Sequence, residues 1–338
     1  MSQQEIVIAI DAMGGDYAPK EIVLGAIQAA KEFNDIKILL VGKIAEIQKI
    51  LDKQKTNDLN IELIDAPEDI SMEEKNPARA VRKAQNSSVV IANKLVKAGK
   101  AHAVIAAGHT GAATAASLFE IGRIDGFDRP CICTLIPNLQ DVMLLIDGGS
   151  NIEATAEHMH QSAILGNILA KILFDKANPR VGLLNIGEEE GKGTELYKKT
   201  YELIKNTSGI NFVGNVEGKT IIDDLCEVAV CDGFVGNMHL KALEGGLKLF
   251  ASEIRKQIKM AGPLGIIAGL LLKITGVFDK LKARFHPNSY GGALLGGIDG
   301  VSIISHGSSN AEAIKNACKQ ARLLVSKDVI NKVKRELV

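Results

Sequence analysis

Short apolar runs alternate with amphipathic stretches along most of the chain. Such runs are typical of buried strands, whereas apolar positions that recur every three or four residues are typical of helices. The runs predict strands at Ile6–Ile10, Ile36–Val41, Ile61–Leu63, Ala103–Ile105, Val142–Ile146, Val181–Leu184, Asn211–Val213, Val228–Val230 and Val301–Ile304. The stretches between them predict helices at Lys20–Glu32, Ala78–Val96, Ala154–Phe174, Thr194–Lys205 and Asn310–Val325. This alternation indicates an α/β fold with a doubly wound, largely parallel sheet.

No internal repeat, low-complexity linker or proline-rich boundary divides the sequence. A change in composition normally marks the linker between independently folded domains. We therefore expect residues 1–338 to form a single α/β domain. Two compact lobes within this domain are also possible, but no change in composition marks a border between them.

One segment departs from the alternation. Pro263–Phe278 reads PLGIIAGLLLKITGVF and is apolar nearly all round, with the single charge of Lys273. It is shorter than the ~20 residues that a bilayer-spanning helix needs, and its glycines make it a poor continuous span. Basic residues flank it, namely Arg255, Lys256, Lys259, Lys280, Lys282 and Arg284. Two interpretations remain open: a buried core helix or dimer contact, and the apolar tip of a helical hairpin (residues 245–285) that dips into an anionic lipid surface.

Composition favours a large aliphatic core and gives no sign of a nucleic acid partner. Hydrophobic residues make up 46% of the 338 residues, aromatic residues only 4%, and tryptophan is absent. An aliphatic core suits strands that are buried on both faces. Lysine plus arginine equals aspartate plus glutamate at 40 each, so no overall field attracts DNA or RNA.

The cysteines and the N-terminus indicate a cytoplasmic protein. The chain contains five cysteines, an odd number, and their positions match neither a disulfide framework nor a zinc site. We expect reduced thiols in or near strands at Cys131, Cys133, Cys226, Cys231 and Cys318. The N-terminus enters the first strand directly, and we expect no signal peptide.

Glycine-rich turns follow several predicted strands, where open α/β sheets bind ligands. The turn after the first strand contains Gly14 and Gly15. Glycine lets the backbone approach a ligand closely, and the helix N-terminus that follows favours an anion. A second turn places His109 between two glycines, where its ring could donate to a bound anion. The alternatives are a glycine turn capped by Asp16 and a purely structural histidine.

Three further turns combine glycines with polar or cationic side chains. The side chains that they bring to strand ends are Asn185, Lys192, Asp232, Asn237, Lys241 and His306. Lys192 lies between two glycines after three glutamates, and a solvated charge run is the alternative reading of that loop. Lys241 follows Asn237 by four residues, which places both on one helix face.

Several well-known motifs do not occur. The sequence contains no G-x-G-x-x-G, Walker A, G-x-S-x-G or H-E-x-x-H pattern. We therefore expect neither a nicotinamide cofactor nor a metal ion. The site is expected to position an anion and to stabilise charge rather than to form a covalent intermediate.

Read in order, these stretches resemble the PlsX family of bacterial acyl-carrier-protein:phosphate acyltransferases. The matching segments include IAIDAMGGDYAPKEIVLGA, LLIDGGSNIEATAEHM, PRVGLLNIGEEEGKGTELYKKT, VCDGFVGNMHLKALEG and ISHGSSNAEAIKNA. The resemblance runs from residue 8 to about residue 317, which is nearly the whole chain. DAMGGD combined with CDGFVGN and HGSSNA is highly specific.

The resemblance implies a fold like that of isocitrate and isopropylmalate dehydrogenases and of phosphotransacetylases. It implies that acyl carrier protein donates an acyl group to inorganic phosphate, without a redox cofactor, giving acyl phosphate for phospholipid synthesis. It also implies a cytoplasmic homodimer that associates peripherally with the membrane. His109 stands where the family more often has asparagine, which favours hydrogen bonding over acid catalysis. The segment Asp147–Asn151 reads DGGSN where D-x-G-A-N is commoner.

Lys192 and Asn237 are the expected catalytic pair. Phosphate is already a nucleophile and a thioester is already activated, so the protein must hold phosphate and stabilise the oxyanion. The other expected substrate- or phosphate-binding residues are Asn185, His109, Asp232, Lys241, His306, Gly14 and Gly15. Asp11 and Asp16 are expected to orient loops. Two rival functions are a short-chain phosphotransacetylase acting on acyl-CoA and a non-catalytic, membrane-docked assembly protein.

Overall fold

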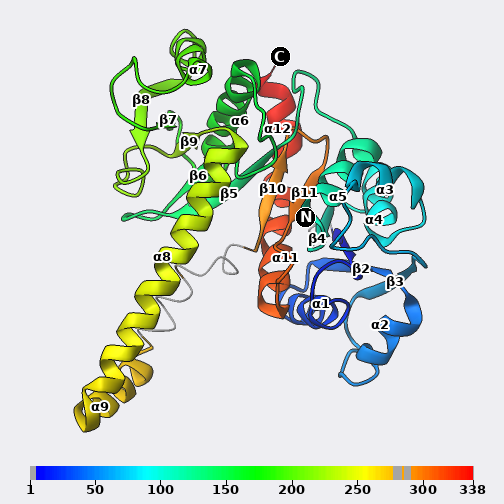
Figure 1. Cartoon of the computed structure of the whole chain (residues 1–338). Coiled ribbons are helices and arrows are strands. Elements are labelled where there is room, and N and C mark those ends of the chain that lie inside the picture. Colours follow the sequence, from blue (N-terminus) through cyan, green and yellow to red (C-terminus); the bar gives the residue numbers. More distant parts are fainter. Residues whose placement is uncertain (1–4, 277–283, 285–290, 338) are drawn as a thin grey trace.

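The computed structural model of the protein describes residues 5–276, 284 and 291–337. Within these residues eleven strands form one sheet, which Figure 1 shows with its helices. The strands are β1 (Ile6–Asp11), β2 (Ile36–Gly42), β3 (Ile61–Asp65), β4 (Ala103–Ala106), β5 (Cys131–Pro137), β6 (Val142–Ile146), β7 (Arg180–Asn185), β8 (Asn211–Glu217), β9 (Val228–Val230), β10 (Ala293–Gly296) and β11 (Val301–Ile304). The helices are α1 (Lys20–Glu32), α2 (Ile44–Leu51), α3 (Pro77–Lys83), α4 (Ser88–Lys97), α5 (Thr110–Ala116) with its π-helical continuation η1 (Ser117–Ile121), α6 (Ala156–Phe174), α7 (Glu195–Lys205), α8 (Gly233–Met260), α9 (Gly262–Ile274), α11 (Ala311–Ser326) and α12 (Val329–Glu336).

The sheet consists of two parallel halves that are joined by antiparallel strands. In the first half β3, β2, β1, β4 and β11 are parallel neighbours. In the second half β6, β9, β7 and β8 are parallel neighbours. Between them β10 is antiparallel to β11 and β5, and β5 is antiparallel to β6. Because the direction reverses at each of these pairings, the carboxyl ends of the two halves lie at opposite edges of the sheet.

Helices cover both faces of the sheet, as the alternation of side chains along the strands requires. In β1 the side chains of Ile8 and Ile10 join the core that packs under α1, α6 and α11, whereas Ala9 joins the core under α4 and α5. In β6 the side chain of Leu144 faces the first core, whereas Leu145 faces a third core near the start of α8. The expected α/β class with a largely parallel sheet is confirmed.

The structure corrects the sequence-based elements in several places. The single helix expected at Ala78–Val96 is two helices, α3 and α4. The Ser87 hydroxyl donates to the Ala84 carbonyl oxygen over 2.7 Å, and such local bonds compete with helix continuation. The strands β5 and β10 and the helices α2 and α12 were not expected from the sequence pattern. The five cysteines are free and buried, as predicted.

A hairpin of two helices, α8 and α9, projects from the body of the molecule (Figure 1). The 28 residues of α8 make it ~40 Å long. The chain turns back at Gly262, whose φ is +60°. A Cβ atom on Gly265 would lie 1.8 Å from the Ile258 carbonyl oxygen, so only glycine allows α9 to pack this closely on α8. The hairpin therefore depends on a backbone contact.

Large apolar side chains are exposed along the outer part of this hairpin. Among the described side chains they include Leu249, Phe250, Met260, Ile267, Leu270, Leu271 and Ile274. Their exposure excludes a helix buried in the core of its own chain. Phe278, Lys280 and Lys282 of the predicted apolar tip and its flank lie outside the described residues. Among the described helices none combines the length and the apolar composition needed to cross a membrane.

A buried carboxylate joins the start of β7 to the start of β9. Glu227 is 4% exposed and accepts hydrogen bonds from the Arg180 guanidinium, the Arg180 backbone amide and the Lys176 ammonium, each at 2.6 or 2.7 Å. Burial acts to raise the pKa of Glu227, but these bonds outweigh it and lower the pKa to about 2. The ion pair therefore stabilises the folded state.

Replacing Glu227 with glutamine should destabilise the protein by on the order of 2–3 kcal/mol at pH 7. The folded-state pKa lies below the ordinary value of 4.5, so this contribution is complete above about pH 5 and is lost as pH falls towards 2. Denaturant unfolding of the wild type and the Glu227→Gln variant, at pH 7 and at pH 3, measures the difference in their free energies of unfolding. This difference should be smaller at pH 3. A difference that does not depend on pH would contradict the stabilising role assigned to the Glu227 carboxylate.

Candidate active site

The first group of candidate residues lies where β1, β4 and β11 end. A Cβ atom on Gly14 would lie 2.9 Å from the Gly108 Cα atom. Gly15 has a φ of +112°, and a Cβ atom there would lie 2.9 Å from a backbone carbonyl oxygen. The Asp16 amide donates to the Gly307 carbonyl oxygen over 2.8 Å. Side chains would hold these three loops apart, so the glycines are what allow the loops to meet.

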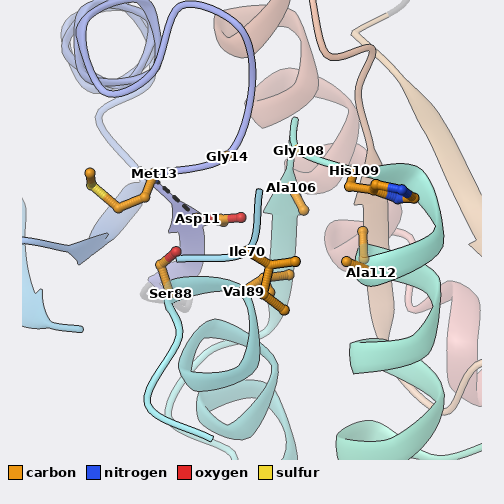
Figure 2. Close-up of a pocket in the computed structure, with 11 residues that line it drawn as sticks. Asp11, Met13, Gly14, Ile70, Ser88, Val89, Ala106, Gly108, His109 and Ala112 are labelled. Atoms are coloured by element: carbon orange, nitrogen blue, oxygen red, sulfur yellow. Dashed lines mark hydrogen bonds between the residues drawn. The ribbon is translucent and has the colours of Figure 1, made fainter. Parts of the chain in front are cut away.

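Asp11 lies in a small pocket between these loops, beside Ser88 and Gly108 (Figure 2). It is 3% exposed, and its Oδ1 atom accepts from the Met13 amide over 3.1 Å. Burial raises the pKa of the Asp11 carboxyl, although hydrogen bonds from Ser88 and from the backbone of Met13 and Gly14 oppose the shift. These bonds fix the loop that carries the glycines, in line with the orienting role expected for Asp11.

His109 lies at the N-terminus of α5, across the pocket from Asp11 (Figure 2). Its Nδ1 atom accepts from the Gly111 amide over 3.0 Å, which caps the helix. The Nδ1 lone pair is therefore used, and the neutral ring carries its proton on Nε2. In this state His109 can donate one hydrogen bond to an anion, as the sequence analysis favours.

The second group surrounds the first turns of α8. Asp232 caps this helix by accepting from the backbone amides of Phe234 (2.8 Å) and Val235 (3.0 Å). The Tyr197 hydroxyl donates to the other oxygen of Asp232 over 2.6 Å. Burial, followed by this bond, raises the pKa of Tyr197, which keeps it a proton donor. Asp232 is 6% exposed. Its carboxylate is therefore largely shielded from solvent, and its hydrogen bonds hold the start of the helix.

Asn237 lies on the second turn of α8, against the loop that follows β6. A Cβ atom on Gly149 would lie 3.3 Å from the Asn237 Cβ atom. The buried Asp147 carboxylate organises this loop by accepting from the backbone amides of Gly149 (3.0 Å), Ser150 (2.8 Å) and Asn151 (2.8 Å). Asn237 itself is exposed, so its amide is available to a ligand.

Lys192 lies on the loop between β7 and α7. Its Nζ atom is 3.7 Å from Glu189 Oε1, and the side chain is 49% exposed. The Asn185 amide donates to the Lys192 carbonyl oxygen and to Asn215 Oδ1, both over 3.1 Å. The Asn215 amide donates to the Glu189 carbonyl oxygen over 2.8 Å. Asn185 thus fixes the loop and leaves the Lys192 ammonium near the surface.

Lys241 and His306 connect the two groups. The Lys241 Nζ atom lies 3.3 Å from His306 Nε2. The helix α8 begins directly after β9, in the second half of the sheet, whereas His306 follows β11 in the first half. Lys241 is nine residues after the cap residue Asp232, a distance of ~13 Å along the helix. The helix α8 therefore carries a side chain from the second half of the sheet to a loop of the first.

The structure thus brings Gly14, Gly15 and the Gly108–His109 turn together in one cluster, and it joins that cluster to α8 through His306. Lys192 and Asn237 occupy separate loops of the second half, one after β7 and one after β9. Tyr290, which the sequence places in a neighbouring glycine turn, lies outside the described residues.

Sequence reasoning missed several residues that hold these loops. They are Ser88, Tyr197 and Asn215, together with the loop-organising role of Asp147. Asp147 could have been found, because an aspartate followed by two glycines is a common loop signal. Tyr197 and Ser88 carry no such signal, since each lies within an ordinary helical pattern.

No cluster of histidine, cysteine and carboxylate side chains that could hold a metal ion occurs among the residues that the structure describes. Besides the carboxylates of Asp11 and Asp232, which hold backbone amides, the two clusters contain amides, hydroxyls, imidazoles and the ammonium groups of Lys192 on its loop and Lys241 on α8. Such groups donate hydrogen bonds to an anion in neutral or cationic form. The arrangement is therefore suited to an anionic substrate.

The chain is similar over its whole length to a set of bacterial enzymes. Residues 6–332 match a family model described as fatty acid synthesis protein. A phosphate acyltransferase of Dictyoglomus turgidum is 46% identical over 327 residues, which cover 96% of this chain and 96% of that protein. A phosphate acyltransferase of Clostridium botulinum is 43% identical over 332 residues, which cover 98% of both chains.

Solved structures with the same fold are more distant in sequence. A phosphotransacetylase from Streptococcus pyogenes has a TM-score of 0.63 at 18% identity, with 98% of this chain and 95% of that chain covered. A 4-hydroxythreonine-4-phosphate dehydrogenase from Klebsiella pneumoniae has a TM-score of 0.53 at 11% identity, with 95% of this chain and 100% of that chain covered. These likenesses support the dehydrogenase-like fold that the sequence analysis expected.

Proposed function

The chain belongs to the fatty acid synthesis protein family and is a phosphate acyltransferase, and we propose that it transfers a long-chain acyl group from acyl carrier protein to inorganic phosphate. The product, an acyl phosphate, would serve phospholipid synthesis. The family match over residues 6–332 carries this proposal, and the anion-binding character of the clusters agrees with it.

The contact between Lys241 and His306 is the best candidate for the phosphate position. His306 Nδ1 lies 2.8 Å from the Ser308 hydroxyl oxygen and 3.2 Å from the Ser308 amide nitrogen, and its Nε2 atom lies 3.3 Å from the Lys241 Nζ atom. The Lys241 ammonium also pairs with Glu244 over 3.3 Å. A phosphate oxygen bound beside Lys241 and His306 would accept a charge-assisted hydrogen bond from the ammonium.

The reaction needs positioning and charge stabilisation. A phosphate oxygen attacks the thioester carbonyl carbon and forms a tetrahedral oxyanion, which collapses as the carbon–sulfur bond breaks. The thiolate leaves with the electron pair and takes up a proton, giving the free thiol and the acyl phosphate. In our proposal Asn237 donates to the oxyanion, and Lys192 neutralises charge on phosphate or oxyanion. His109 and the glycine loop at Gly14 and Gly15 complete the anion-binding surface.

The donor is expected to carry a long acyl chain. A short-chain phosphotransacetylase has no need of lipid contact, whereas the α8–α9 hairpin exposes large apolar side chains between Leu249 and Ile274, seven of them among the side chains that the structure describes. We propose that this hairpin brings a cytoplasmic, homodimeric enzyme to an anionic membrane surface. A non-catalytic assembly protein would not need the buried carboxylates that fix the loops of both clusters.

The direct test of the proposed function is release of thiol from acyl carrier protein. The purified protein is incubated with a palmitoyl-loaded carrier, with and without inorganic phosphate, and both free thiol and acyl phosphate are measured. We expect equal amounts of the two products and no release without phosphate. Release that does not depend on phosphate, or a strong preference for acetyl-CoA, would contradict the proposal.

Turnover should persist when metal ions and nicotinamides are removed. The proposed chemistry needs only phosphate, the thioester and hydrogen-bond donors of the chain. After dialysis against EDTA, the rate in the thiol-release assay should therefore stay within about twofold of that of the untreated enzyme. A change of this size is far smaller than the rate loss caused by removing one oxyanion donor. A rate that collapses and returns on addition of a divalent metal would show that an essential metal site exists.

A further inference from the structure

The chain has no net charge overall, but the charged side chains of one stretch are all positive, histidine aside. From Lys75 to Phe119 the sequence contains no aspartate or glutamate, and Glu73 and Glu74 lie just before it. Lysine and arginine occur seven times there, at positions 75, 79, 82, 83, 94, 97 and 100. The stretch forms α3, α4 and α5, which lie together on one side of the first half of the sheet (Figure 1). An excess of positive charge of this kind favours a local positive field, although Glu68 and Glu120 lie beside the stretch.

The cations of α3 are exposed and available. Arg79 and Lys83 are one helical turn apart and share a face, and Lys75 precedes the helix. In the part of the chain that the structure describes, these three form no ion pair. Arg82 lies over the exposed Phe119 ring, 4.6 Å from its centroid. The surface therefore presents unneutralised charge beside an aromatic side chain.

This surface adjoins the candidate active site. The Pro77 Cγ atom lies 2.9 Å from the position of a Cβ atom on Gly111, and the Gly111 amide donates to His109. Because α3 has seven residues, its far end at Lys83 is only ~10 Å further along the helix axis. A partner seated on α3 would thus lie at the rim of the anion-binding cluster.

We propose that the α3 surface, formed by Lys75, Arg79, Arg82 and Lys83, docks the acidic surface of the carrier protein that delivers the acyl thioester. This inference rests on the proposed function. It adds the docking surface, which the reaction itself leaves undefined. Opposite charges would steer the carrier to the site entrance and fix its orientation.

A lipid surface fits α3 less well than an acidic protein does. The large exposed apolar side chains that could enter a bilayer are concentrated on α8 and α9. In Figure 1 the tip of this hairpin lies far from α3, on the other side of the molecule. A membrane bound at the hairpin tip would therefore leave α3 open to a soluble partner.

The test compares two charge reversals in the full-length protein. Arg79→Glu with Lys83→Glu alters the α3 surface. Lys31→Glu with Lys49→Glu is the matched control, since these exposed lysines lie in the last turns of α1 and α2 and give the same change in net charge. Each protein is assayed with acyl carrier protein and with acyl-pantetheine, a donor that lacks charge.

We expect the ratio of kcat/KM for the carrier to kcat/KM for acyl-pantetheine to fall about tenfold or more in the α3 variant, mainly through KM. The control ratio should stay near that of the wild type. The α3 effect should shrink as salt is raised, because salt screens exposed charges.

Three other outcomes have distinct meanings. Equal ratios in both variants, with acyl phosphate still formed, would overturn the docking surface and leave the function intact. Loss of binding to anionic vesicles in the α3 variant, with an unchanged ratio, would assign the surface to lipid and overturn the proposal. Absence of acyl phosphate from the wild type with either donor would instead refute the proposed function.

Discussion

Asn237→Ala and Lys192→Ala should each lower phosphate-dependent acyl transfer by about a hundredfold, the scale found when one oxyanion donor is removed. Both side chains are exposed, Lys192 on the loop before α7 and Asn237 on the second turn of α8, so truncation should leave no buried cavity and the fold should survive. If Asn237 donates mainly to the oxyanion, kcat should fall while KM for the carrier changes little. Steady-state thiol release at varied phosphate and donor concentrations measures both constants.

Met238→Ala is the matched control for Asn237→Ala. Met238 is the next residue of α8 and is 57% exposed, so its truncation alters the same turn without removing a polar group. We expect activity close to that of the wild type. Folded Asn237→Ala and Lys192→Ala proteins that retain activity within a few-fold would remove these two residues from the catalytic centre.

Leu270→Glu combined with Leu271→Glu should release the protein from anionic vesicles. These leucines are 57% and 56% exposed on α9, and burying a leucine side chain contributes about 1.5–3 kcal/mol. Losing both should therefore weaken vesicle partitioning by at least about a hundredfold, and glutamate adds repulsion from anionic headgroups. Co-sedimentation with vesicles measures the change, and binding of the wild type should weaken as salt is raised.

Transfer from soluble acyl carrier protein should change little in this hairpin variant, because the clusters lie at the other end of α8. Leu225→Glu with Leu323→Glu is the control, since these leucines are 40% and 44% exposed outside the hairpin. The competing interpretation is a dimer contact. It predicts that the wild type fails to co-sediment and that the hairpin variant becomes monomeric in sedimentation velocity.

Local sequence signals predicted the outer elements of the fold well. The first helix was expected at Lys20–Glu32, and α1 has those bounds. The helix expected from Ala154 begins instead at Ala156. Thr155 is its N-cap residue and forms a capping box with His158, so Ala154 and Thr155 lie outside the helix. Apolar runs and caps are properties of a few neighbouring residues, and the sequence alone displays them.

The centre of the fold could not be predicted in the same way. The strands β5 and β10 reverse the direction of the sheet, and nothing within Cys131–Pro137 or Ala293–Gly296 specifies antiparallel partners from distant parts of the chain. The contact between Lys241 and His306 spans 65 residues, so no local signal in the sequence predicts it. The turns that carry candidate residues were therefore recognisable, but their grouping into two clusters was not.

The position of β11 has a consequence for the order in which the protein can fold during synthesis. Residues 301–304 fill the place between β4 and β10 in the middle of the sheet, while β6 to β9 come from the contiguous residues 142–230. At ~5–20 residues per second, β4 waits on the order of ten to forty seconds for this neighbour to leave the ribosome. During that interval one edge of β4 is unpaired and open to wrong partners. The second half of the sheet can therefore mature first, and the first half closes only when translation is almost complete.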